Sequence, residues 1–114
     1  MQIGIDLGAT KIESVLLDAE GSELHRSRKE SPQNYKDTIA SITESVNLIE
    51  KKFKKNFNVG VCHPGSTNFD SGLIQNANNS PWLNNMSFID DISKNLNRKV
   101  LCENDANCFS LSES

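Results

Sequence analysis

The sequence lacks the features that define two common classes of small protein. Its 114 residues contain three cysteines without Cys-x-x-Cys spacing, and its two histidines lie far apart. An odd cysteine count with this spacing argues against a disulfide framework and against a structural zinc site. We therefore expect Cys62, Cys102 and Cys108 to be buried free thiols. We assign no metal-binding role to His25 or His63.

Basic charge and long apolar runs are also missing. The formal net charge is -3, which disfavours a nucleic-acid-binding protein, because such proteins are usually basic. No apolar run approaches the roughly 18 residues that would span a bilayer. The N-terminus shows no charged segment followed by an apolar signal core. We therefore expect a cytoplasmic protein with neither membrane nor nucleic acid as a partner, and the length suits one compact domain.

The first thirty residues have the pattern of three strands joined by short turns. Apolar and β-branched residues predict strands at Gln2–Leu7 and Lys11–Leu17. A more polar alternation predicts an exposed edge strand at Ser22–Lys29. Gly21 suits the second turn because glycine adopts a positive φ without strain. The three strands should form an antiparallel meander.

A helical period follows the meander. Asn34 is a plausible N-cap, and Asp37 lies in the first turn, where the helix dipole favours a carboxylate. The apolar residues that line one helix face are spaced three and four apart: Ile39, Ile42, Val46, Ile49 and Phe53. The lysines at the helix end are better explained as a solvated terminus than as an anion-docking patch: Lys51, Lys52, Lys54 and Lys55.

The remaining segments complete an α/β pattern. We expect strands at Asn58–Cys62 and Arg98–Cys102, a short helix at Phe88–Leu96, and a helix that begins at Ala106 and still runs at Ser114. A long irregular stretch, Thr67–Trp82, separates the two halves, and loops of this length are usually functional or disordered. The predicted fold is a mixed five-stranded sheet with flanking helices. Because the chain stops inside an element, we expect a fragment.

The first candidate site is the turn after the first strand. A strand followed by a glycine-containing turn presents backbone N–H groups that can bind phosphate oxygens, and this one reads Asp6-Leu-Gly8-Ala-Thr10-Lys11. Thr10 adds a hydroxyl and Lys11 a positive charge. Asp6 is placed to hold Mg²⁺ through water, since that ion usually keeps several waters. Taken alone, the motif is equally compatible with an ordinary hairpin.

Two further polar segments suit a hydroxyl-rich ligand. His63-Pro64-Gly65-Ser66 ends a strand sharply, although Pro-Gly most often marks only a turn. In the segment 76–82, asparagine side chains both donate and accept hydrogen bonds, as sugar hydroxyls do. Trp82 is better explained as an anchor of this loop than as a platform for a sugar ring.

The last motif lies at the predicted junction of a strand and a helix, with the sequence Glu103-Asn104-Asp105-Ala106-Asn107. A carboxylate there is either an N-cap or a general base. On its own, Asp105 fits the cap better. Its position beyond the carboxyl end of a strand is nevertheless where ligands bind in open α/β sheets.

In order and spacing, the four motifs closely resemble those of the ROK family, which groups bacterial sugar kinases with sugar-responsive repressors. Two of the motifs are most similar to those of the fructokinase and N-acetylglucosamine kinase branch, namely Asn76-Ala77-Asn78 and Asn104-Asp105-Ala106-Asn107-Cys108. The resemblance covers the whole chain but only the first part of a family member. It implies the actin-like, ribonuclease-H-type fold of two similar domains, with residues 1–114 as the N-terminal domain.

The resemblance also implies roles for individual residues. Asp105 would be the general base that takes a proton from a sugar hydroxyl as it attacks the γ-phosphate of ATP. The sugar would be held by the side chains of Asn78 and Asn104 and by the Gly65-Ser66 turn. Gly8, Thr10 and Lys11 would lie near the nucleotide phosphates, with Asp6 near Mg²⁺. Phosphoryl transfer depends mainly on positioning and charge stabilisation, so this arrangement is physically sensible.

Two positions depart from the family pattern. Ala9 replaces the more frequent second glycine of the phosphate turn, so this position must adopt a conformation that a Cβ tolerates. His63 replaces an aliphatic residue before Pro64-Gly65, which should perturb the packing beneath that turn. Neither change removes a proposed functional side chain.

The resemblance places the adenosine pocket, the second phosphate loop and a cysteine-rich zinc site in a second half that the chain does not contain. We therefore expect a homodimer for the full-length protein and little or no kinase turnover from residues 1–114. The favoured substrate is fructose, followed by N-acetylglucosamine or glucose. Alternatives are the sugar-binding domain of a family repressor and a non-catalytic sugar-binding module. Family repressors carry a helix-turn-helix segment before the Asp6 strand, whereas Met1 directly precedes that strand here.

Overall fold

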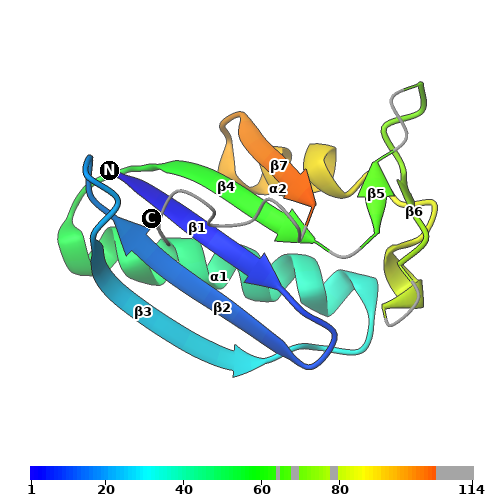
Figure 1. The fold of residues 1–114 in the computed structure, drawn as a ribbon, viewed down its shortest axis with the longest axis horizontal. Coiled ribbons are helices and arrows are strands. Elements are labelled where there is room, and N and C mark those ends of the chain that lie inside the picture. The colour runs from blue at the N-terminus through cyan, green and yellow to red at the C-terminus, as the bar shows by residue number, and fades with distance from the viewer. Residues whose placement is uncertain (64, 68–69, 78–79, 105–114) are drawn as a thin grey trace.

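The structure is a computed structural model that describes residues 1–63, 65–67, 70–77 and 80–104, without the side chains of 66, 67 and 102–104. Its centre is one mixed sheet in the order β3-β2-β1-β4-β7 (Figure 1). The strands are β1 (Gln2–Leu7), β2 (Lys11–Leu17), β3 (Glu23–Glu30), β4 (Asn58–His63) and β7 (Val100–Asn104). β1, β2 and β3 are antiparallel neighbours, whereas β1, β4 and β7 run parallel. The predicted meander and five-stranded sheet are confirmed.

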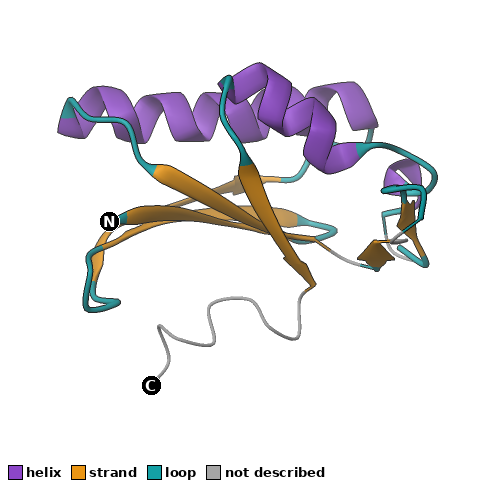
Figure 2. Cartoon of the chain, turned by 90° about the horizontal axis from the view of Figure 1, so that it is seen from above, coloured by secondary structure: helices purple, strands orange, loops and turns teal. Residues whose placement is uncertain are grey.

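Two helices cover one face of this sheet (Figure 2), namely α1 (Tyr35–Phe53) and α2 (Phe88–Leu96). Alternate residues of the central strands, such as Ile3, Ile5 and Val61, are fully or almost fully buried in one core cluster with Ile42 and Ile92 of the helices. The alternation follows from the two-residue period of a strand, which sends successive side chains to opposite faces. Burying one such side chain stabilises the fold by about 1.5–3 kcal/mol, so this layer dominates the stability.

Helix α1 begins as the sequence predicts. The Asn34 side chain accepts a hydrogen bond of 2.8 Å from the Asp37 amide, which is the geometry of an N-cap. The helix ends at Phe53, and its C-cap residue, Lys54, lies in the left-handed region with a φ of 54°. Lys51 and Lys52 lie in the last turn, where the helix dipole favours positive charge.

Strand β7 begins two residues later than predicted. Arg98 lies in the connection from α2, where its guanidinium donates to both carboxylate oxygens of Glu50 and, over 2.7 Å, to the carbonyl of Phe57. The preceding residue, Asn97, is the C-cap of α2 and lies in the left-handed region with a φ of 54°. Arg98 is therefore occupied by a tertiary contact, and the ladder starts only at Val100.

The stretch predicted to be irregular is more ordered than expected. It contains a two-stranded hairpin of β5 (Ser66–Thr67) and β6 (Ile74–Gln75), followed by the 3₁₀ turn η1 (Pro81–Leu83). Ile74, Ala77 and Leu83 are buried in the core. These apolar residues are too widely spaced to give a helical or strand period, so the sequence pattern missed them.

The expectation of free thiols is wrong for Cys62, which is buried and disulfide-bonded. Its partner lies outside the described side chains. An odd number of cysteines does not exclude a disulfide, because two of three cysteines can pair. The helix predicted from Ala106 also lies outside the described residues. Among the described residues, neither α1 nor α2 combines the length and the apolar character that a membrane span requires.

Candidate functional site

The predicted site residues that the structure describes lie toward one edge of the sheet. Because β1, β4 and β7 are parallel, their carboxyl ends meet there (Figure 1). The turn at 8–10 follows β1, Gly65 lies shortly after β4, and Asn104 ends β7. In register, His63 pairs with Asn104. Motifs separated by up to a hundred residues in sequence are therefore neighbours, at the edge where ligands bind in open α/β sheets.

The turn between β1 and β2 is tight. The Gly8 amide donates to the Lys11 carbonyl over 2.9 Å, and a Cβ on Gly8 would approach that same oxygen to 3.0 Å. The side chains of Thr10 and Lys11 are exposed at its tip. Ala9 does not have a positive φ, so its Cβ causes no backbone strain. Ala9 thus adopts a conformation that a Cβ tolerates, as expected from the sequence.

Two contacts tie this turn to the connection between β3 and α1. The Ser31 amide donates to the Thr10 carbonyl over 2.9 Å. The Gln33 side-chain amide donates to the carbonyls of Ala9, over 3.1 Å, and of Ser31, over 3.0 Å. The turn is thus supported from a segment more than twenty residues away in sequence.

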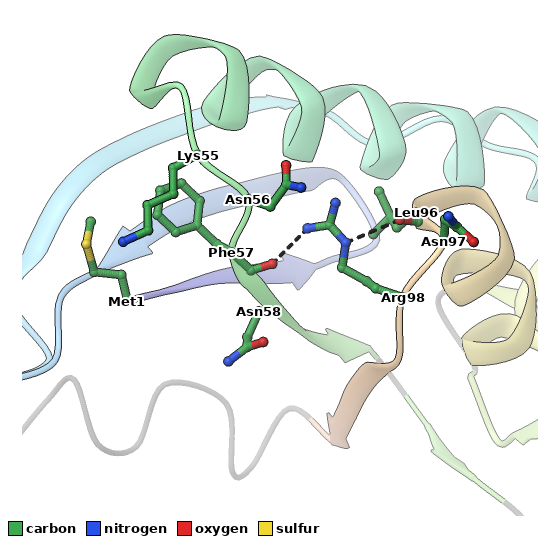
Figure 3. Close-up of a pocket in the computed structure, with 8 residues that line it drawn as sticks. All are labelled: Met1, Lys55, Asn56, Phe57, Asn58, Leu96, Asn97 and Arg98. Atoms are coloured by element: carbon green, nitrogen blue, oxygen red, sulfur yellow. Dashed lines mark hydrogen bonds between the residues drawn. The ribbon is translucent and has the colours of Figure 1, made fainter.

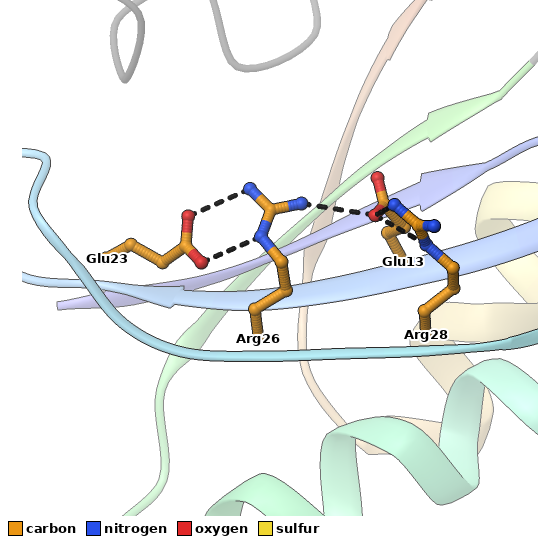
Figure 4. A network of polar contacts seen from close by, with 4 residues as sticks. All are labelled: Glu13, Glu23, Arg26 and Arg28. Carbon is orange, nitrogen blue, oxygen red and sulfur yellow. Dashed lines mark hydrogen bonds and ion pairs between the residues drawn. The ribbon is translucent and has the colours of Figure 1, made fainter.

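Asp6 lies one residue before the end of β1, directly opposite Glu13 of β2. Like charges at opposed positions of neighbouring strands repel each other. Glu13, however, accepts hydrogen bonds of 2.6 and 2.9 Å from Arg28 and lies 3.3 Å from Arg26 (Figure 4). The hydrogen bond from Arg28, with the two guanidinium charges, lowers the pKa of Glu13.

Arg26 also pairs with Glu23 over 2.7 Å, which completes a network of two arginines and two glutamates on the sheet surface. The arginines neutralise Glu13, so Asp6 faces a compensated neighbour. In the described part of the chain no three His, Cys, Asp or Glu residues gather as a metal site. A single carboxylate such as Asp6 fits a Mg²⁺ ion that keeps most of its waters.

Gly65 packs directly against the backbone after β6. Its φ is 79°, and a Cβ there would lie 2.3 Å from the Gln75 carbonyl oxygen and 3.0 Å from the Ala77 nitrogen. Only glycine avoids both the left-handed strain and this clash. The close approach holds the segment that leads to Asn78 against the turn that follows β4.

The loop after β6 is fixed by a residue that the sequence did not single out. The Asn84 side chain accepts a hydrogen bond of 3.0 Å from the Ala77 amide, and the Asn85 amide donates to the Ile74 carbonyl over 2.8 Å. Trp82 is partly buried against the core, which confirms its predicted role as a loop anchor. Its Nε1 is buried and has no hydrogen-bond partner among the described residues.

His63 directly precedes Pro64, at the position where the family pattern has an aliphatic residue. Its ring is buried and lies edge-on to Phe88 of α2, with ring centroids 5.7 Å apart and an angle of 71° between the planes. The imidazole therefore fills space between the end of β4 and the start of α2. Edge-to-face contacts of this kind are favourable between aromatic rings.

Several predicted site residues fall outside the described structure. Asn78 and Asp105 lie there entirely, and only the backbones of Ser66 and Asn104 are described. Ser66 belongs to β5, where it pairs with Gln75. The structure therefore describes the backbone positions of Ser66 and Asn104, and the proposed roles of all four side chains stay predictions.

A separate hollow of about 510 Å³ lies at the opposite edge of the sheet, where β4 begins (Figure 3). Arg98 lines it, but this guanidinium is bound by Glu50 and by the Phe57 carbonyl. Burial alone would raise the pKa of Glu50, but the hydrogen bonds from Arg98 and from the Phe57 amide, with the arginine charge, lower it. This pair links α1 to the connection before β7 and is structural.

Sequence reasoning missed Gln33, Asn84 and the Glu50–Arg98 pair. Glu50 and Arg98 are 48 residues apart, and Gln33 and Ala9 are 24 apart, so no local pattern links them. For Asn84 the sequence offered a partial signal, namely the Asn84-Asn85 pair. Asparagine tolerates the left-handed region, and Asn85 adopts it with a φ of 65°. A run of Asn-Asn beside a buried loop is therefore worth testing as a loop support.

Comparisons with known proteins agree with this arrangement. The sequence profile described as "ROK family" matches residues 2–114. The chain is 36% identical over 115 residues to the N-acetyl-D-glucosamine kinase of Haemophilus influenzae (strain 86-028NP), covering 100% of this chain and 38% of that relative. The chain thus spans little more than a third of the length of this relative.

Solved structures share the fold. A ROK family glucokinase from Streptomyces griseus, in complex with glucose and AMPPNP, matches with a TM-score of 0.81 and 25% identity, over 93% of this chain and 33% of that one. A ROK family transcriptional regulator, a homologue of the Escherichia coli MLC protein, matches with a TM-score of 0.71, over 91% and 27%, but its 17% identity shows the fold alone. The α/β, actin-like fold is confirmed, and this chain belongs to the ROK family.

Proposed function

We propose that the chain is the N-terminal domain of an ATP-dependent sugar kinase and carries one side of its active site. The observation that carries the proposal is the convergence of the turn at 8–10, Gly65 and Asn104 at the carboxyl edge of three parallel strands. The turn after β1 would bind the phosphates of the nucleotide, and the polar segment after β4 would bind the hydroxyls of the sugar. Both substrates of phosphoryl transfer would thus be bound at this edge. The kinase names of relatives such as the N-acetyl-D-glucosamine kinase support the same assignment.

In this proposal each segment has one task. The backbone around Gly8 and the Thr10 hydroxyl bind the nucleotide phosphates, and Lys11 adds a positive charge. Asp6 would hold a Mg²⁺ ion through its water shell, and that ion would supply positive charge beside the phosphates. Gly65, Ser66, Asn78 and Asn104 orient the sugar.

Asp105 is the proposed general base. It directly follows Asn104, the last residue of β7, and takes the proton of the attacking hydroxyl. A correctly placed general base contributes about 10²–10⁴-fold to the rate. The adenosine pocket, the second phosphate loop and the zinc site of the family would belong to a second domain, and the domain alone would have little or no turnover.

The sugar is a hexose or an N-acetylhexosamine. Fructose is the prediction from the sequence motifs, whereas the relatives are named for N-acetylglucosamine and glucose. The experiment is a panel of these three sugars with ATP, using the full-length protein that contains this chain and an assay of ADP release. Sugar-dependent ADP release with at least one sugar supports the proposal. Binding of a sugar without ATP turnover would instead support a repressor-type or non-catalytic module.

A further inference from the structure

The side chain of Gln33 donates a hydrogen bond to the proposed phosphate turn. Its Nε2 lies 3.1 Å from the Ala9 carbonyl oxygen and 3.0 Å from that of Ser31. Both partners are carbonyl oxygens, which only accept, so the chemistry fixes the amide with its nitrogen toward the turn. The side chain thus bridges the turn and the connection between β3 and α1.

The connection that carries Gln33 is itself held in place. The Ser31 amide binds the Thr10 carbonyl over 2.9 Å. Asn34, the next residue after Gln33, caps α1. Tyr35 then donates its hydroxyl to the carboxylate of Asp91 in α2. Gln33 itself is exposed, but it extends from this anchored segment, so its amide is held within reach of the turn.

The contact also determines where one amide of the turn points. In a trans peptide the carbonyl and the following N–H point in opposite directions, and the described chain contains no cis peptide. Because the Ala9 carbonyl faces Gln33, the Thr10 N–H faces away from it. An amide held in a set direction binds a phosphate oxygen without first losing backbone freedom.

The same contact suits the alanine at position 9. Glycine samples backbone conformations that alanine does not, and Ala9 adopts an ordinary negative φ here. The Cβ of Ala9 limits the backbone conformations at position 9, and the hydrogen bond from Gln33 restrains the Ala9 carbonyl. Both limit the turn to one conformation.

We infer that Gln33 is a positioning residue, which orients the Ala9–Thr10 peptide for binding of the nucleotide phosphates. This inference rests on the proposed kinase function. It extends that function to a residue outside the recognised motifs, which acts through the backbone and does not itself touch the substrate.

The test uses Gln33→Met and Gln33→Ala in the full-length protein that contains this chain. Methionine keeps the length of the side chain but has no N–H donor. Gln2→Ala is the matched control, since Gln2 is an exposed glutamine at the opposite end of β1. We expect both Gln33 variants to raise the KM for ATP about 3–10-fold while the KM for the sugar stays within about twofold of wild type, because only one substrate site is altered. Gln2→Ala should change neither constant.

Hydrogen exchange of the peptide that spans residues 8–11 gives a readout independent of catalysis. The Gln33 variants should exchange several-fold faster there than wild type or Gln2→Ala. Unchanged exchange in Gln33→Met would overturn the inference, as would equal rises in both KM values with a lower melting temperature. If the wild-type protein transfers no phosphate to any sugar, the proposed function fails, and the exchange comparison alone decides whether Gln33 holds the turn.

Discussion

The carbonyl oxygen of Gln75 lies 2.3 Å from the point that a Cβ on Gly65 would occupy. This contact joins the turn after β4 to the end of β6, and both segments border the proposed sugar site. The arrangement leaves no space for any side chain at position 65. Gly65 therefore supports the proposed site mainly because its lack of a side chain allows this close approach.

Gly65→Ala should destabilise the chain more than Gly72→Ala. Gly72 has a similar φ of 73° but nothing within 4 Å of its Cβ position, so it isolates the left-handed strain of about 1–2 kcal/mol. At Gly65 the clash with backbone adds about 1–3 kcal/mol. Urea denaturation of the 114-residue chain would measure both, and equal losses in the two variants would show that the close approach does not exist in solution.

Arg98→Leu should lower the free energy of unfolding by about 2 kcal/mol, because it removes charge-assisted hydrogen bonds from a carboxylate that is only 10% exposed. Arg28→Leu is the matched control. Arg28 is 63% exposed, and exposed pairs contribute about 0–1 kcal/mol. The same urea experiment compares them, and a larger effect at Arg28 would contradict this ranking.

The Glu50–Arg98 pair also predicts a pH dependence. The folded chain lowers the pKa of Glu50 below its ordinary value of 4.5, so the folded state binds this proton less readily than the unfolded state. The resulting stability is complete above pH 4.5 and disappears as the pH falls through the lower, folded pKa. Urea midpoints between pH 6 and 3 should therefore fall less steeply for Glu50→Gln than for wild type. Parallel curves would argue against the pair.

Tyr35 is the single tyrosine of the chain, so its ionisation has its own absorbance signal near 295 nm. Burial, with the hydrogen bond to Asp91 and the charge of that carboxylate, raises the pKa of Tyr35 above its ordinary value of 10.0. Stability from this group is therefore present below pH 10 and is lost as the pH rises through the folded pKa. The tyrosinate signal of the native chain should appear at higher pH than that of the urea-unfolded chain. Identical midpoints would exclude the contact.

Much of the fold follows from local patterns. The bounds of β1 and β2 agree with prediction because β1 alternates, β2 is rich in aliphatic and β-branched residues, and each strand ends at a polar turn. The start of α1 agrees because Asn34 and Asp37 form a local cap. The predicted start of β7 was wrong because Arg98 pairs with Glu50, which lies on another element. The hairpin of β5 and β6 was missed because its contact with Gly65 depends on tertiary packing.

The candidate site was predictable to a similar extent. Parallel strands bring their carboxyl ends together whatever their sequence separation, so the convergence of the motifs followed from the expected topology. The supports of the site did not follow. Gln33 and Asn84 act on backbone groups at 9 and 77, and a hydrogen bond between a side chain and a distant backbone leaves no period or composition in the sequence.

The most direct test of the proposed function is transfer of the γ-phosphate of ATP to a sugar by the full-length protein, with and without Asp105→Ala. We predict formation of the sugar phosphate by wild type and a reduction of about 10²–10⁴-fold in the variant, with the melting temperature little changed. Loss of folding in the variant would favour the helix-cap role of Asp105. Sugar phosphate formation at the wild-type rate in Asp105→Ala would contradict the assigned base, and its absence in the wild type would contradict the kinase itself.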